Sequence, residues 1–169
     1  MIAGIDPARE LVDVVDEDDR VVATVTRREV RRRGLLHRCA YVLVRNPAGE
    51  VLVHRRTDTK DVHPGAYDVF AGGVCAAGES YDDCARREVA EEVGVVGADL
   101  RFLFRHRYRG PGGQVWGAVY EVRWDGPVRH QPSEVAWSAW VGPERLRRML
   151  EELEFCPDSR EIFERLRVP

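Results

Sequence analysis

Short apolar runs rich in β-branched residues recur along the chain and predict β-strands. Residues 11–15 and 21–26 flank an acidic turn at 16–20, which predicts a hairpin near the N-terminus. A second hairpin is expected because the turn-forming residues 46–49 lie between two further apolar runs. The strands expected after the first hairpin are 39–44, 51–55, 69–71, 100–108, 114–123 and 139–141.

A polar cap and a terminal glycine predict a short first helix. Thr26 followed by Glu29 matches the capping-box pattern, and Gly34 is the type of residue that ends a helix in a left-handed turn. The arginine-rich segment 27–33 within this helix is interpreted as a solvated helix face.

A longer helix is expected over residues 81–93, because Ala85, Val89 and Val93 recur at four-residue spacing. Two more helices are predicted, one starting at Pro143 and one over 157–166. Hairpin-connected strands combined with a few helices favour an α/β (α+β) fold. In this fold a mixed β-sheet is sandwiched between helices and is preceded by an N-terminal β-hairpin extension.

The length of 169 residues fits one domain (1–169), with residues 1–35 as an extension and 36–169 as the core. No apolar run is long enough to span a bilayer and the N-terminus lacks the pattern of a secretory signal. We therefore expect a cytoplasmic protein without a membrane partner. The net charge of −3 provides no basic field for nucleic acid, so no nucleic-acid partner is expected. Four cysteines without a C-x-x-C pair are interpreted as reduced thiols.

Three carboxylates on the helix at 81–93 are the strongest candidates for chemistry. At about 100° per residue, Glu88, Glu91 and Glu92 fall within roughly a third of the helix circumference. Carboxylates at this density repel one another unless a cation lies among them, and hard oxygen ligands suit Mg²⁺ that also binds phosphate. The pattern predicts a metal site, with a solvated acidic face as the alternative. Glu79 and Arg87 are expected to pair and to brace the preceding loop against the helix.

The segment 73–95 resembles the Nudix box, and every constrained position of that box is filled. The matching residues are Gly73, Glu79, Arg87, Glu88, Val89, Glu91, Glu92, Gly94 and Val95. The resemblance implies the Nudix fold and a Mg²⁺-dependent hydrolase, with Mn²⁺ as an alternative ion. Such an enzyme cleaves the diphosphate linkage of a small molecule, here a nucleoside diphosphate or a derivative of one. The resemblance also implies that Glu88, Glu91, Glu92 and the carbonyl of Gly72 bind the metal.

A hydrolase of this kind needs a group that accepts a proton from the attacking water. Glu91 and Glu92 are the candidates within the box, because both are expected beside the metal. The family often recruits a carboxylate from outside the box. The segment Ser133-Glu134-Val135 resembles the usual approach to the final strand, which makes Glu134 a further candidate. The alternative interpretation of Glu134 is an exposed loop acid.

Residues outside the box resemble the branch related to isopentenyl-diphosphate isomerase. The resemblance rests on Leu36-His37-Arg38, Val53-His54-Arg55-Arg56, Lys60 and Pro64-Gly65. The cysteine and the histidine that this isomerase uses are replaced here by Gly72 and Val74, so hydrolysis is favoured over isomerisation. An isomerase-like enzyme and a catalytically silent binding module stay open as alternatives.

Cations near the box are candidates for binding a diphosphate. Arg55, Arg56 and Lys60 lie at a strand end and in the following loop, where an arginine fork could bind phosphate oxygens. Solvated surface charge is the alternative for each. Trp116 lies in an expected strand and could stack on a nucleobase, although core packing is the more frequent role of such a residue. The extension ahead of the core could contribute to a homodimer.

Overall fold

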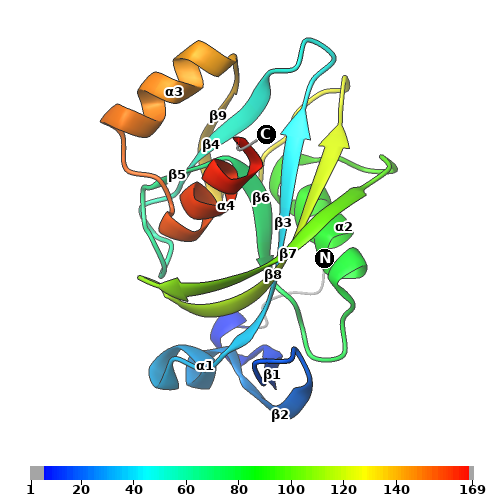
Figure 1. The fold of residues 1–169 in the computed structure, drawn as a ribbon, viewed down its shortest axis with the longest axis vertical. Helices are drawn as coiled ribbons and strands as arrows, with labels where there is room; N and C mark the ends of the chain where they lie inside the picture. Colours follow the sequence, from blue (N-terminus) through cyan, green and yellow to red (C-terminus); the bar gives the residue numbers. More distant parts are fainter. Residues whose placement is uncertain (1–5, 168–169) are drawn as a thin grey trace.

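The computed structural model describes residues 6–167, so both ends of the predicted domain 1–169 lie outside the described residues. A nine-stranded sheet forms the centre of this part of the chain, and helices pack on both of its faces (Figure 1). The strands are β1 (Leu11–Val15), β2 (Val21–Thr26), β3 (His37–Arg45), β4 (Val51–Arg56), β5 (Tyr67–Asp68), β6 (Phe70–Val74), β7 (Arg101–Gly110), β8 (Gly113–Arg123) and β9 (Val135–Val141). The helices are the 3-10 turn η1 (Pro7–Arg9), α1 (Arg27–Arg33), α2 (Tyr81–Val93), α3 (Pro143–Glu152) and α4 (Pro157–Arg167).

The strand β3 organises the sheet because it pairs with four other strands. It runs antiparallel to β1, β4 and β6 and parallel to β8. The strands β7 and β8 form a long hairpin, β9 pairs with β4, and β2 extends the sheet beyond β1. A parallel pairing among antiparallel ones makes the sheet mixed, as the sequence predicted.

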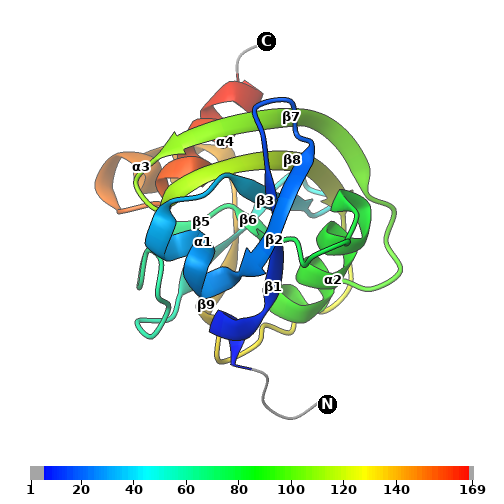
Figure 2. The same ribbon diagram turned by 90° about the horizontal axis from the view of Figure 1, so that it is seen from below.

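Side chains alternate across β3 and contribute to a separate core on each face of the sheet. Tyr41 and Leu43 belong to the core that α3 and α4 cover, where Ile162 is fully buried. Ala40 and Val42 belong to the core that α2 covers. Figures 1 and 2 show α2 on one side of the strands and α3 with α4 on the other. The prediction of a sheet sandwiched between helices is therefore confirmed.

The N-terminal extension folds as a small lobe, formed by the hairpin β1–β2 and α1 (Figure 2). The side chain of Thr26 caps α1 by accepting a hydrogen bond from the Glu29 amide at 3.3 Å, and Gly34 ends the helix with a φ of 60°. The buried apolar residues of this lobe are Val12, Val14 and Val30.

Asp19, in the turn of this hairpin, anchors the lobe to the core. Its φ of 62° lies in the left-handed region, which Asp and Asn tolerate better than most residues. Its carboxylate accepts hydrogen bonds from Arg38 at 2.7 Å, from Arg105 at 2.6 Å and from the Tyr81 hydroxyl at 3.1 Å. These donors belong to β3, β7 and α2, so one carboxylate ties the extension to three elements of the core.

Two expected strands differ from the observed bounds by more than two residues. The strand expected near 69–71 is divided into β5 and β6, because the Asp68 side chain accepts a hydrogen bond from the Phe70 amide at 2.9 Å and turns the backbone there. The strand β9 begins at Val135 rather than at residue 139, because its pairing with β4 extends that far. No helix among residues 6–167 is both long and apolar enough to cross a membrane.

Candidate active site

The helix α2 brings the three predicted carboxylates to a cavity of about 870 Å³. It begins after Ser80, whose hydroxyl accepts a hydrogen bond from the Asp83 amide at 3.1 Å, and it ends at Gly94 with a φ of 77°. Its apolar stripe is buried against the sheet. The carboxylate-bearing residues that line the cavity from this helix are Glu88, Glu91 and Glu92. The cavity has a size that suits a small-molecule ligand.

The residues that line this cavity come from three parts of the chain. The Nudix-like segment contributes α2 and the end of β6, and the loops after β4 and before β9 contribute a second group. The N-terminal extension contributes the third group, which includes η1 and one side of α1. The lining residues of the extension are Asp6, Pro7, Ala8, Arg9, Glu10, Leu11, Arg27 and Arg31. The extension is therefore part of the site and not an appendage to it.

Glu92 is the most buried of the three carboxylates. The residue is 5% exposed, and its Oε2 atom accepts a hydrogen bond from the Gly72 amide at 3.0 Å. Burial raises the pKa of Glu92 to about 8, and repulsion from Glu88 acts in the same direction. A negative charge on this carboxylate is therefore costly unless a cation approaches it.

Glu88 lies against the backbone of β6. A β-carbon built on Gly73 would fall 2.6 Å from the Glu88 Oε1 atom, and one built on Gly72 would overlap the Ala40 carbonyl oxygen. Only glycine leaves room for these approaches. Burial raises the pKa of Glu88, although the neighbouring Arg87 guanidinium opposes this shift.

Glu79 and Arg87 form the pair that the sequence predicted. The guanidinium donates to both carboxylate oxygens of Glu79 at 2.8 Å, in a bidentate arrangement. The Ala76 amide donates to the same carboxylate at 2.9 Å. Burial disfavours the charge on Glu79, but the bonds from Arg87 and Ala76 outweigh it and lower the pKa of Glu79. The pair therefore fixes the loop before α2 to the helix.

Arg87 also reaches the cavity carboxylates. Its Nη1 atom donates to Glu88 at 2.7 Å and lies 3.5 Å from Glu91. Opposite charges nearby and burial act against each other on this guanidinium, and the carboxylates dominate, so the pKa of Arg87 is raised. Arg87 thus supplies part of the positive charge that the carboxylates need, and it positions Glu88 beside β6.

The donor atoms of α2 fit Mg²⁺. They are carboxylate oxygens only, and they adjoin a cavity that leaves room for water and phosphate ligands. Burial raises the pKa values of Glu88 and Glu92, so a bound cation would offset the cost of their charges. Mg²⁺ binds through one or two carboxylates while keeping several waters, so the three glutamates need not converge on a single point.

A second group of atoms that could bind a metal ion involves the loop between β6 and α2. It consists of one atom each from Cys75, Glu79 and Cys84, and these atoms lie within 4.8 Å of one another. A hydrogen bond with Cys75, together with burial, raises the pKa of Cys84, so this thiol stays protonated. Both oxygens of Glu79 already accept bonds from Arg87. The group is therefore better described as core packing around the ion pair than as a metal site.

The structure brings two further predicted residues to the cavity. Glu134 and Lys60 both line it, and they form an ion pair with each other. Lys60 also lowers the cost of charge on Glu92. The remaining predicted substrate contacts do not line this cavity: Arg55 pairs with Asp58 at 2.7 Å, and Arg56 donates to the Val62 carbonyl. Their roles stay predictions.

Trp116 lies outside the cavity as well. Alternation along β8 places it on the same face as Ala118, which belongs to the core that α2 covers. Its carbonyl oxygen lies 3.4 Å from the Tyr81 hydroxyl that donates to it, and its indole nitrogen is buried without a hydrogen-bond partner among the described residues. Stacking of Trp116 on a nucleobase stays a prediction that this geometry does not support.

The interpretation of 27–33 as a solvated helix face is wrong for two of its arginines. Arg28 and Arg32 have side chains that are 68% and 74% exposed, whereas those of Arg27 and Arg31 are 22% and 29% exposed and line the cavity. The sequence held a signal for this, because Val30 marks the buried side of the helix and Arg27 lies one turn before it.

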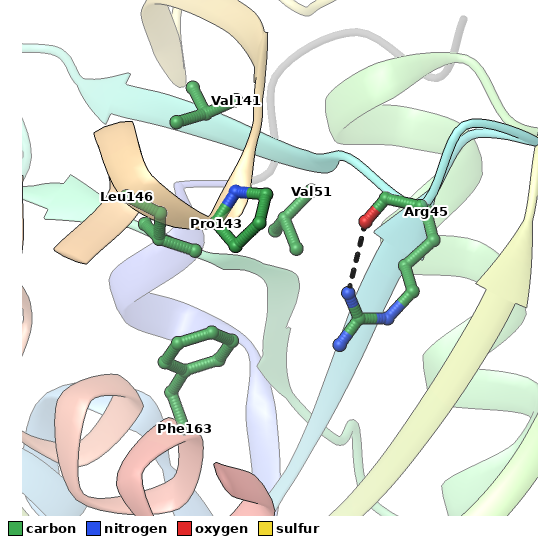
Figure 3. A pocket seen from close by; sticks show the side chains of 7 residues that line it. Arg45, Val51, Val141, Pro143, Leu146 and Phe163 are labelled. Carbon is green, nitrogen blue, oxygen red and sulfur yellow. Dashed lines mark hydrogen bonds between the residues drawn. The ribbon is translucent and has the colours of Figure 1, made fainter.

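A second cavity of about 150 Å³ lies between the β3–β4 hairpin, α3 and α4 (Figure 3). Its lining is mainly apolar, with Val51, Val141 and Leu146 among its residues. The charged group there, Arg45, donates to the carbonyl of Gly49 at 3.3 Å within its own hairpin. This cavity has no carboxylate in its lining, so it offers no comparable chemistry.

Comparison with known proteins agrees with this geometry. The family model described as NUDIX domain matches residues 35–166. An uncharacterized Nudix hydrolase of Streptomyces coelicolor is 50% identical over 163 residues, which cover 95% of this chain and 90% of the relative.

Solved structures show the same fold. DR0079 from Deinococcus radiodurans superimposes with a TM-score of 0.80 at 29% identity, covering 92% of this chain and 98% of that one. The Nudix domain of Shewanella oneidensis NrtR, solved in complex with ADP ribose, has a TM-score of 0.62 at 18% identity, covering 78% of this chain and 85% of that one. At that identity the likeness shows the fold alone.

Proposed function

The chain belongs to the Nudix family of hydrolases, which act on pyrophosphate bonds, and on this premise we propose that it hydrolyses a small diphosphate with the help of Mg²⁺. Nucleoside diphosphates and their derivatives are the proposed substrate class, with Mn²⁺ as an alternative ion. One observation carries the proposal: three carboxylates of one helix line a cavity of about 870 Å³ to which Lys60 also contributes a cation.

Glu88, Glu91, Glu92 and the carbonyl of Gly72 are the proposed metal ligands. Mg²⁺ held there supplies a positive charge that polarises a phosphoryl oxygen and makes bound water more acidic. The chain's own contribution is orientation. The Gly72 amide fixes the Glu92 carboxylate and Arg87 fixes that of Glu88. Lys60 is the proposed partner for a phosphate oxygen, with its side chain only 16% exposed beside the cavity.

Glu91 is the proposed group that accepts the proton of the attacking water. Its side chain is 54% exposed and borders the cavity, whereas Glu92 is buried against Gly72. Glu92 and Glu134 are the alternatives for this role. Glu134 borders the same cavity, but its carboxylate is held by Lys60 and would have to leave that ion pair to act as a base.

The geometry favours hydrolysis over the isomerase-like alternative. No cysteine of residues 6–167 lines the cavity, and Cys75 is buried at 2% exposure. His37, which resembles an isomerase metal ligand, is buried with its Nδ1 atom 2.9 Å from the Leu35 carbonyl, and burial lowers its pKa. Cys75 and His37 therefore pack in the interior of the protein.

The proposal is tested by incubating the protein with Mg²⁺ and a panel of nucleoside diphosphates, dinucleotides, nucleotide sugars, ADP ribose, coenzyme A and isopentenyl diphosphate, with products identified by mass spectrometry. The variant Glu92→Gln should lose turnover, while Glu151→Gln, an exposed change on α3, should keep it. Isomerised isopentenyl diphosphate would support the isomerase alternative. Metal binding without turnover of any panel member would support a silent binding module.

The proposed compartment rests on the cysteines. All four cysteines are free thiols, which supports the cytoplasm as the proposed compartment. The homodimer and the lack of a nucleic-acid partner stay predictions.

A further inference from the structure

The helix α1 presents two of its arginines to the active-site cavity. Arg27 and Arg31 are four residues apart, so they lie on the same side of the helix. Both line the cavity that Glu88, Glu91 and Glu92 line from α2. The helix lies outside residues 35–166, which match the family model, so these arginines belong to no feature of the Nudix box. They are cations supplied to the site by the extension.

Each of these arginines is held in place by one carboxylate. The Nη1 atom of Arg27 lies 3.2 Å from Glu10, and the Arg27 amide donates to the Glu10 carbonyl at 2.8 Å. The Nη1 atom of Arg31 pairs with Asp61 in the loop after β4. A guanidinium has five N–H donors, so one carboxylate contact at one nitrogen leaves donors for another anion. The carboxylates thus orient the arginines without saturating them.

Arg27 has donor capacity that the described residues do not fill. Its Nε atom is buried and has no hydrogen-bond partner among them. A buried donor without a partner is costly. The side chain as a whole is 22% exposed and lines the cavity, where an anionic ligand could accept from the guanidinium.

The two arginines also repel each other. Burial lowers the pKa of Arg31, and the charges of Arg27 and Arg56 lower it further. The charge of Arg27 also stabilises the anion of Glu88, so the two groups are close enough to interact. The cavity therefore has carboxylates on α2 and two guanidinium groups on α1, each of which is paired with one carboxylate. A metal would bind at the carboxylates of α2, and phosphate oxygens would bind at the remaining guanidinium donors.

We propose that Arg27 and Arg31 bind phosphate oxygens of a diphosphate on the side turned away from the carboxylates of α2, so that the N-terminal extension forms half of the substrate site. The inference rests on the proposed function, because it takes a diphosphate as the ligand. Arginine suits this role, since its planar fork can bind two phosphate oxygens at once. Lys60 contributes a third cation from the loop after β4.

The test measures binding instead of turnover. Methylenediphosphonate, a diphosphate analogue whose P–C–P bridge cannot be hydrolysed, is titrated into the full-length protein with Mg²⁺ in a calorimeter. Arg27→Gln and Arg31→Gln should each weaken its binding by about tenfold or more, because each removes a charge-assisted hydrogen bond. Arg28→Gln and Arg32→Gln are matched controls on the exposed side of the same helix and should bind within about twofold of the parent protein. Equal losses in all four variants, or none in Arg27→Gln and Arg31→Gln, would overturn the proposal.

A second variant distinguishes a phosphate-binding role of Arg31 from a purely structural one. If Arg31 only tied the extension to the loop after β4, then Asp61→Asn would break the same ion pair and weaken binding as much as Arg31→Gln does. A phosphate-binding Arg31 predicts the opposite, since Asp61→Asn removes a competing carboxylate and should leave binding equal or tighter. This outcome is independent of the panel assay. If Arg27→Gln and Arg31→Gln weaken binding but no panel member is turned over, the hydrolase is rejected and the arginine site is kept. If a panel member is turned over but the two variants bind methylenediphosphonate normally, the hydrolase is kept and the arginine site is rejected.

Discussion

Gly73 lies so close to Glu88 that a β-carbon at residue 73 would fall 2.6 Å from the Glu88 Oε1 atom and 2.7 Å from its Cδ atom. The carboxylate therefore occupies the space that every other residue type would fill. The position of a proposed metal ligand is set by the lack of a side chain on the neighbouring strand.

The first prediction concerns this contact. Gly73→Ala should push the Glu88 carboxylate away from β6 and lower kcat by about tenfold or more, with a weaker affinity for Mg²⁺. The fold should tolerate the change, because the far end of a flexible side chain can move. Gly142→Ala is the control, since a β-carbon there meets only Glu50 at 4.0 Å. Titration with Mn²⁺ followed by electron paramagnetic resonance, combined with steady-state kinetics, measures both effects. Unchanged Mn²⁺ affinity in Gly73→Ala would contradict the argument.

The second prediction concerns the bidentate pair of Glu79 and Arg87. Arg87→Lys keeps the charge but cannot bridge both Glu79 oxygens while also reaching Glu88, so it should lower kcat by about 10- to 100-fold. The exposed neighbour Arg86 provides the control Arg86→Lys, which should retain activity. Steady-state kinetics over a range of Mg²⁺ concentrations measures the effect. Full activity of Arg87→Lys would show that charge alone suffices at this position.

The third prediction concerns the pH dependence of stability. Burial, with repulsion from Arg56, Lys60 and His130, lowers the pKa of His54 to about 3. The folded state therefore keeps His54 neutral, while the unfolded state takes up a proton below its ordinary pKa of about 6.5. The contribution of neutral His54 to the free energy of unfolding is fully present above pH 6.5, and it is lost as the pH falls toward 3. Between pH 7 and pH 5 this group alone should cost roughly 2 kcal/mol of unfolding free energy.

The measurement for His54 is a difference between two proteins. Urea unfolding of the parent protein and of His54→Gln is followed from pH 7 to pH 5, so that the other titrating groups cancel. The stability of the parent should fall more steeply than that of the variant. A difference that stays constant across this range would mean that His54 does not carry the pH dependence.

The fourth prediction concerns the anchor of the extension. Asp19→Asn should keep the left-handed backbone but remove the charge that binds Arg38 and Arg105, and so destabilise the fold by about 1–2 kcal/mol. Asp18→Asn is a matched control in the same turn, with a side chain that is 67% exposed. Urea unfolding midpoints compare the two variants. Equal midpoints would mean that the anchor contributes nothing to stability.

The sequence predicted most of the local structure because local rules decide it. The bounds of α2 follow from the apolar spacing of Ala85, Val89 and Val93 and from the glycine at its end, and both survive in the fold. The carboxylates of α2 could be predicted for the same reason, since the helix period alone places them on one side.

The contacts between distant segments could not be predicted in this way. Lys60 and Glu134 are 74 residues apart in the sequence, and the place of Arg27 in the lining of the cavity depends on how β1 pairs with β3. The run of charges along α1 indicates a solvated helix face, because the sequence does not say which segments lie beside that helix in the fold. Residue type alone makes Trp116 a candidate for stacking on a nucleobase, but the register of β8 against β3 decides which face of the sheet its side chain lies on.

The pairing of β3 with β6 also bears on how the protein folds. Ala40 is paired with Gly73 and Tyr41 with Gly72, and a β-carbon at residue 72 would overlap the Ala40 carbonyl. A shift by one residue would turn every side chain of the strand to the wrong face. A shift by two would place Phe70 or Val74 at the position of Gly72, where a β-carbon overlaps the Ala40 carbonyl. Gly72 therefore selects the strand register, because a misaligned strand would press a side chain against the backbone of β3.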